Sequence, residues 1–307
     1  MWATDQYYDI VGVRVRIHCT STALAAHVAA ALGRFAVLGD GPSQSDVCYN
    51  LVAGKEPTRR GQRGFHFLYL ETSRLRRTTL VSELIAGLVD DLAARLPGLL
   101  PDPDVYALII GIVMRGDAAV LLAGATPVAT RRLVAAFCAR GYDYASSTTL
   151  YLDSADRSWF PCSLPLVCAD ADEAAGLRTL GIAFPGADGP GDAYPLVAEL
   201  PPADATRSTA HTTSASLRRP AMAIRALVVE TPTSDGAGAV EPLGRTRAVM
   251  RLLERSANFQ GRAAERPALV RDVLAHAAMF EVRRPERAGT AHVGDELAVR
   301  AVDRTLE

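Results

Sequence analysis

The sequence predicts an α/β fold with a small N-terminal α/β lobe over residues 1–97 and a larger mixed-sheet domain, flanked by helices, over residues 98–307. Apolar stretches of strand length alternate along the chain with segments whose apolar residues recur at helical spacing. A helix-stopping pair, Pro97–Gly98, separates the two parts. The length of 307 residues suits two domains of ordinary size.

In the N-terminal lobe, alternating apolar and polar residues predict a strand over Ile10–His18. A run of hydroxyl residues then offers an N-cap for an alanine-rich helix that ends at Gly33. Two further strands, Asp46–Val52 and Phe65–Leu70, lead into a helix over Arg74–Leu96, whose large apolar residues share one helical face.

The second domain is predicted to continue the alternation of strands and helices. Its strands are expected at Tyr106–Val113, Ala118–Ala123, Tyr142–Leu152, Ala221–Val229 and Met279–Arg283, and its helices at Ala129–Arg140, Arg245–Ser256, Pro267–Ala278 and near the end of the chain. Two loops, Phe184–Pro195 and Pro201–Ser216, interrupt the second half; the latter has little apolar surface to bury.

Composition excludes several classes of function. The 33 Lys and Arg residues are balanced by 34 Asp and Glu residues, which argues against binding nucleic acid through bulk charge. The start lacks the pattern of a secretory signal, and no apolar run is long enough to cross a bilayer, so a cytoplasmic protein without a membrane partner is expected. The only lysine is Lys55, so any mechanism that requires a lysine depends on it.

Residues 99–152 have the order of a phosphate-binding loop unit. A strand ends at Gly124, a helix follows, and Gly141 precedes the next strand. In such a unit, N–H groups at the helix start hold phosphate and a lysine reaches the terminal phosphates. If Gly124 is the first glycine of the loop, then Ala129, Thr130 and Arg131 stand where the motif has Gly-Lys-Ser/Thr.

Four short segments carry a resemblance to a known family. They are LPGLL at Leu96–Leu100, the turn Arg115–Gly116, VLLAG ending at Gly124, and Arg140–Gly141–Tyr142. With these segments the chain resembles the HPr kinase/phosphorylase family, and most closely the related proteins encoded in gene clusters that make ribosomally synthesised, modified peptides, including lasso peptides. The resemblance implies a kinase-like fold with a phosphate-binding loop.

The chain departs from this family at the positions that perform phosphoryl transfer. The loop lysine is missing, and the Ser-Asp-Asp strand end of the family is Ser146–Ser147–Thr148. A histidine of the preceding hairpin aligns with Ile109. Phosphoryl transfer depends on stabilising charge with lysine and metal, so we expect a pseudokinase that binds neither ATP nor magnesium.

The remnant of the loop is the first candidate binding site. Its ligand-binding residues are predicted to be Gly124, Ala125, Thr126, Thr130, Arg131 and Arg132. If the cleft has been repurposed for catalysis, the catalytic residues would be Arg131, Ser146, Ser147 and Thr148, which could together hold an anion or carboxylate. The alternative is a solvated helix start with polar neighbours.

A second candidate is a basic segment of the N-terminal lobe, where Arg59, Arg60 and Arg63 could bind an acidic peptide against a strand edge. The alternative is a solvated, charged turn. The six histidines lack metal-ligand spacing, so no metal site is predicted.

Three functions follow from the sequence. The first is a catalytically degenerate protein that binds a precursor peptide, or a partner biosynthetic enzyme, in the maturation of a peptide natural product. The second is an ATP-independent enzyme that modifies a peptide in the old cleft, and the third is a divergent peptide kinase. Assembly into a homo-oligomer stays open.

Overall fold

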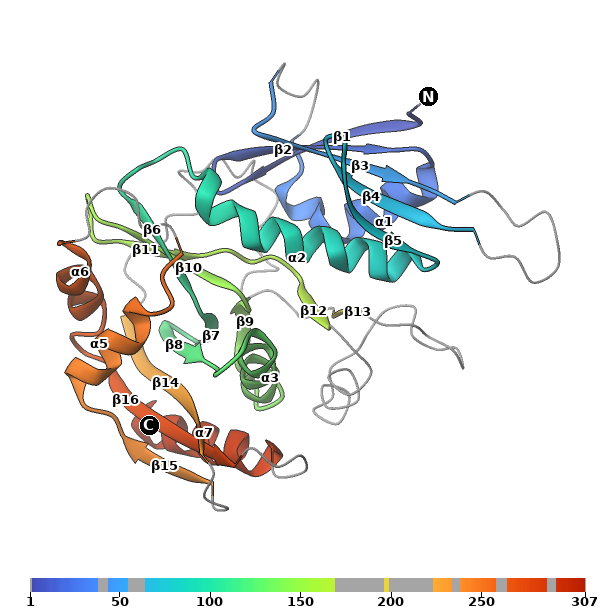
Figure 1. Ribbon diagram of the computed structural model, residues 1–307. Helices are drawn as coiled ribbons and strands as arrows, with labels where there is room; N and C mark the ends of the chain where they lie inside the picture. Colours follow the sequence, from blue (N-terminus) through green and yellow to red (C-terminus); the bar gives the residue numbers. More distant parts are fainter. Residues whose placement is uncertain are drawn as a thin grey trace.

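The computed structural model describes residues 2–37, 44–54, 64–168, 196–198, 223–233, 238–257, 264–285 and 291–306. It confirms the α/β class: mixed sheets are covered by helices in both halves of the chain (Figure 1). The predicted loops at 184–195 and 201–216, together with Arg59, Arg60 and Arg63, lie outside the described residues. Among the described helices, none is long and apolar enough to cross a membrane.

The N-terminal half is built on a five-stranded sheet. Its strands follow chain order: β1 (Thr4–Ile10), β2 (Val13–Cys19), β3 (Val47–Val52), β4 (His66–Leu70) and β5 (Ser73–Thr78). The helices α1 (Thr22–Leu32) and α2 (Val81–Leu99) pack on one face, with a short 3-10 turn, η1 (Gly33–Phe35), after α1. The alternating residues of β2 supply buried side chains to this face.

Two predicted elements of this half are wrong in detail. The strand predicted over Ile10–His18 begins only at Val13, as β2, because Val11 and Gly12 both have positive φ and form the tight turn of a hairpin with β1. The helix predicted over Arg74–Leu96 begins only at Val81, since residues 73–78 pair with β4 as a strand. That helix also continues past Pro97 to Leu99.

The second half is built on a six-stranded mixed sheet. Its order is β15 (Ala239–Pro242), β16 (Ala278–Pro285), β14 (Ala223–Thr233), β8 (Ala118–Ala123), β7 (Gly111–Arg115) and β9 (Asp143–Ser146). The three central strands, β16, β14 and β8, are parallel. One face packs against α3 (Pro127–Cys138) and α7 (Ala291–Leu306), and the other against α5 (Arg245–Leu253) and α6 (Arg266–Val273).

A small three-stranded sheet connects the halves. Its order is β11 (Trp159–Pro161), β10 (Thr149–Asp153) and β6 (Val105–Ile109); β12 (Leu166–Cys168) and β13 (Leu196–Ala198) form a separate pair. Tyr151 and Phe160 belong to the same apolar core as the N-terminal helices. That core therefore extends beyond residue 97, and a domain boundary at this point stays a prediction.

Two apolar segments predicted as single strands each divide between two sheets. The segment Tyr106–Val113 breaks at Ile110, and Tyr142–Leu152 breaks at Ser147–Thr148. The two breaks are adjacent, since the N–H of Ile110 donates to the Thr148 carbonyl at 3.0 Å. Both halves of each segment are buried, so the hydrophobic pattern does not mark the break. The chain passes from β9 of the six-stranded sheet to β10 of the three-stranded sheet at Ser146–Thr148. These residues therefore lie at the edge of the larger sheet.

Candidate functional site

The candidate site lies at the carboxyl ends of the parallel strands of the larger sheet. Strand β8 ends at Ala123, which pairs with Val229 of β14, so Glu230 of β14 lies beside the start of the β8–α3 connection. Open α/β sheets bind ligands at this edge. The predicted loop residues Gly124, Ala125 and Thr126 form the whole connection between β8 and α3.

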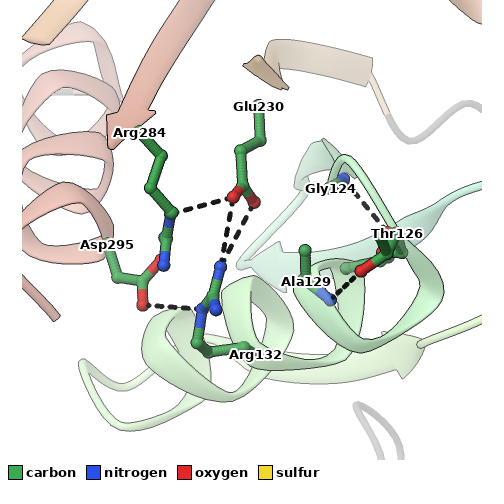
Figure 2. A network of polar contacts seen from close by, with 8 residues as sticks. Gly124, Thr126, Ala129, Arg132, Glu230, Arg284 and Asp295 are labelled. Carbon is green, nitrogen blue, oxygen red and sulfur yellow. Dashed lines mark hydrogen bonds and ion pairs between the residues drawn. The ribbon is translucent and has the colours of Figure 1, made fainter. Parts of the chain in front are cut away.

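This connection is short and closed by its own hydrogen bonds. The Thr126 hydroxyl accepts the Ala129 N–H at 3.1 Å and so caps α3 (Figure 2). The Thr130 hydroxyl is buried; it accepts the Gly124 N–H at 3.0 Å and donates to the Thr126 carbonyl at 3.2 Å. Pro127 has no N–H to offer. Two donors at the start of α3, the N–H groups of Gly124 and Ala129, are therefore engaged within the protein.

Gly124 is packed against the first turn of α3. A Cβ at this position would lie 2.2 Å from the Thr130 nitrogen and 2.4 Å from the Ala129 carbonyl carbon. Gly111 on β7 is similarly tight against α3, because its Cβ would lie 2.5 Å from a Val134 methyl group. The first turns of α3 thus lie directly against the end of β8 and against β7.

Arg132, a predicted ligand-binding residue, is already paired within the protein. It belongs to a buried charge network with Glu230 on β14, Arg284 on β16 and Asp295 on α7 (Figure 2). Its Nη2 lies 3.2 Å from Glu230 Oε1, and its Nε lies 3.3 Å from Asp295 Oδ2. The role of Arg132 in ligand binding stays a prediction, while its structural pairing is plain.

Arg284 is the second cation of this network and contacts the same two carboxylates. Its Nε lies 2.8 Å from Glu230 Oε1, and its Nη2 contacts Asp295 Oδ1. The side chains of Glu230 and Asp295 are 4% and 2% exposed, so both carboxylates lose their hydration on folding. Burial raises the pKa of Asp295, and the two guanidinium groups oppose this shift. The network balances two positive against two negative charges and ties α3 and α7 to the parallel strands.

Arg131 does not join this network in the described contacts. It is buried, at 9% exposure, and it has an interaction partner of its own. It is also not among the residues that line the pocket beside the loop. The sequence predicts that Arg131 and Arg132 form one basic pair at an anion site. In the structure the two side chains have different surroundings, because only Arg132 contacts the Glu230–Asp295 network in the part of the chain that the structure describes.

Ser146, Ser147 and Thr148 form the turn where the chain crosses between sheets. The Ser146 hydroxyl donates to the Cys162 carbonyl at 2.7 Å and accepts the Thr149 N–H at 3.1 Å. The Ser147 hydroxyl contacts the Tyr144 hydroxyl at 3.1 Å. Burial raises the pKa of Tyr144 well above its usual value, so this phenol stays neutral. These contacts show that Ser146 and Ser147 hold the turn in place. A catalytic role for either serine stays a prediction.

An open pocket of about 280 Å³ adjoins the loop. Its walls are the loop and first turn of α3, Ile109 at the end of β6, and residues 254–256 after α5. The Ile109 N–H donates to the Arg255 carbonyl at 2.8 Å, which fixes the backbone of this wall. The pocket combines an apolar floor with polar groups from two elements, as small ligand sites do.

Arg255 is the cation in this wall. Its side chain is half-buried, and it makes no hydrogen bond or ion pair with a residue of the described parts of the chain. Burial lowers the pKa of Arg255, and Arg251 nearby lowers it further, while the carboxylates of Glu254 and Glu230 raise it. An arginine nevertheless stays charged in proteins, so this guanidinium favours an anionic partner. Carboxylates and phosphates both fit its bidentate geometry.

The sequence did not identify Glu230, Arg284, Asp295 or Arg255. A signal for Glu230 exists, because it follows a continuous apolar strand at the edge where ligands bind. The other three residues become visible only once strand order is known. Within the described residues, no group of three or more His, Cys, Asp or Glu side chains could hold a metal ion.

Comparisons with known proteins leave the family unassigned. No family model matches the chain, and no curated protein matches it significantly.

Proposed function

We propose that this chain is a kinase-like scaffold without phosphotransferase activity, which binds a precursor peptide, or the enzyme that modifies it, during maturation of a peptide natural product. The observation that carries the proposal is the hydrogen bond from the Gly124 N–H to the Thr130 hydroxyl, at 3.0 Å. It closes the loop at the place where the resemblance to HPr kinases requires an open phosphate cradle.

The chemistry of the remaining side chains supports the same proposal. No lysine occurs after Lys55, and the strand end that carries two aspartates in the family carries Ser147 and Thr148. A magnesium nucleotide would therefore lack both its lysine and its acidic ligands. The cytoplasm, where precursor peptides are made, is the compartment that fits this role.

The pocket beside the loop supplies a place for part of the peptide. We place a carboxylate of the peptide, from a side chain or the C-terminus, against the Arg255 guanidinium. The loop and Ile109 form the adjoining wall, which suits an apolar neighbour of that carboxylate. A partly desolvated arginine that makes no hydrogen bond or ion pair with the described residues is a common anchor at binding interfaces.

Co-expression tests this function. The chain is produced together with a short candidate precursor peptide, chosen from the open reading frames near its gene. The chain is purified by affinity, and the peptide is measured by mass spectrometry. We expect the peptide to co-purify with an unchanged mass. A gain of one phosphoryl group would overturn the proposal in favour of a divergent kinase. Any other mass change would favour the repurposed enzyme.

Replacing Arg255 by glutamine is expected to reduce the co-purified peptide about tenfold, because a charge-assisted contact to a carboxylate is lost. Arg251→Gln is the matched control. Arg251 lies one turn earlier, is 41% exposed, and pairs with Glu254 at 3.4 Å. It should leave the amount of peptide within about twofold. Equal losses in both variants would remove Arg255 from the binding site.

A further inference from the structure

One face of the N-terminal sheet has no helix on it among the described elements. The helices α1 and α2 both pack on the opposite face, where Leu68 of β4 is buried (Figure 1). Side chains alternate along a strand, so Phe67 and Tyr69 point to the uncovered face. Across the sheet they pair with Arg77 and Arg74 of β5.

The cations on this face fall into two groups. On β2, Arg16 pairs with Asp5 and Arg14 pairs with Asp46 at 3.3 Å, so their charges are neutralised locally. On β5, Arg74 and Arg77 are exposed and have no carboxylate partner within the described part of the chain. Among the described residues of this face, unpaired positive charge is therefore available at the β5 end.

Aromatic rings lie beside these two arginines. The Arg77 guanidinium stacks on the Phe65 ring, 3.6 Å from its centroid, and Phe65 is 41% exposed. The rings of Phe67 and Tyr69 stack with their centroids 6.1 Å apart. An exposed apolar group framed by unpaired cations is typical of an interaction surface.

We propose that the β4–β5 face, defined by Phe65, Phe67, Tyr69, Arg74 and Arg77, binds an extended peptide that carries carboxylates next to apolar side chains. This inference rests on the peptide-binding function proposed above and adds a second contact surface to it. The carboxylates pair with the two arginines, and the apolar side chains pack on the rings.

The composition of the face favours a peptide over a single-stranded nucleic acid. Nucleic acids also stack on aromatic rings, but they carry a phosphate at every nucleotide and require a continuous basic track. The β4–β5 face offers two unpaired cations, and beyond it the arginines of β2 are already neutralised by Asp5 and Asp46. Two carboxylates on a peptide match this charge.

The two edge strands of the N-terminal sheet, β1 and β5, differ in whether their outer edges are covered. The outer edge of β1 is covered, since Ala36 bridges to Tyr8 and the Val37 N–H donates to the Tyr7 carbonyl at 2.9 Å. The outer edge of β5 has no partner strand in the described ranges. Leu75 is an extra residue in the β5 ladder, and such a bulge disfavours continuous strand pairing. Side-chain contacts on the face therefore provide most of the binding.

Fluorescence anisotropy with the full chain tests the proposal. The probe is a fluorescein-labelled peptide of alternating glutamate and valine, compared with a lysine–valine peptide. We expect the glutamate peptide to bind, and Arg74→Glu/Arg77→Glu to weaken it at least about tenfold. Arg300→Glu/Arg304→Glu, an equal charge change on exposed positions of α7, should stay within about twofold. The β5 variant should in turn bind the lysine peptide.

Three results would overturn the proposal: equal weakening in both double variants, no binding of the glutamate peptide, or tighter binding of single-stranded oligodeoxythymidine than of the glutamate peptide. The co-expression experiment keeps this inference separate from the proposed function. If the precursor peptide co-purifies equally with wild type and the β5 variant, the β4–β5 face is wrong and the proposed function stands. If wild type retains no precursor peptide or partner enzyme, the proposed function itself fails.

Discussion

Glu230→Ala is expected to lower the free energy of unfolding by about 3–5 kcal/mol, because it leaves the buried Arg284 and the partly buried Arg132 with a single carboxylate. Glu230 lies 2.8 Å from Arg284 Nε and 3.2 Å from Arg132 Nη2, and its side chain is 4% exposed. Urea unfolding of the purified protein measures the effect.

Glu241→Ala provides the control for this prediction. Glu241 lies on β15 of the same sheet and pairs with Arg283 at 3.0 Å, but both side chains are 46% exposed. Exposed pairs contribute about 0–1 kcal/mol, so this variant should unfold nearly as wild type does. If the two variants lose similar stability, the charge network does not hold α3 against the parallel strands.

Gly124→Ala is expected to cost at least about 3 kcal/mol of folding free energy. The added Cβ would lie 2.2 Å from a backbone nitrogen, and a backbone contact cannot be relieved by a rotamer change. Relief requires moving the first turn of α3, which breaks the bond between the Gly124 N–H and the Thr130 hydroxyl. The buried N–H then loses its acceptor. Thermal and urea unfolding both report the loss.

Gly33→Ala is the matched control. Gly33 has a helical φ of −55° at the end of α1, and a Cβ there would meet no atom within 4 Å. Alanine at such a position reduces the entropy of the unfolded chain, so a gain of roughly 0.5 kcal/mol is expected. A Gly124→Ala protein as stable as the Gly33→Ala protein would mean that the loop is not closed, and the main argument against phosphate binding would fail.

Much of the fold could be predicted from hydrophobic periodicity. The strand Ala118–Ala123 was placed at its observed bounds, and the predicted helix Ala129–Arg140 corresponds to α3 within two residues at each end. Errors arose where a buried chain passes from one sheet into another, as at Ile110, because both strands are apolar. They also arose at β5, whose arginines fit a helix face and a strand equally well.

The candidate site was predictable only in part. The missing lysine and aspartates are visible in the sequence, and they predict the loss of a nucleotide site. The ion pairs of Arg132 and Arg284 with Glu230 and Asp295 join residues up to 163 positions apart, so no local pattern signals them. Arg255 is brought to the loop by the contact of its backbone with Ile109 on β6.

Titration calorimetry with magnesium ATP measures directly whether the closed β8–α3 loop still holds a nucleotide. The wild-type chain should show no saturable binding stronger than about 1 mM, with or without magnesium. Micromolar, magnesium-dependent binding would contradict the account, because it would require the Gly124–Thr130 contact to open and a phosphate cradle to form at the start of α3.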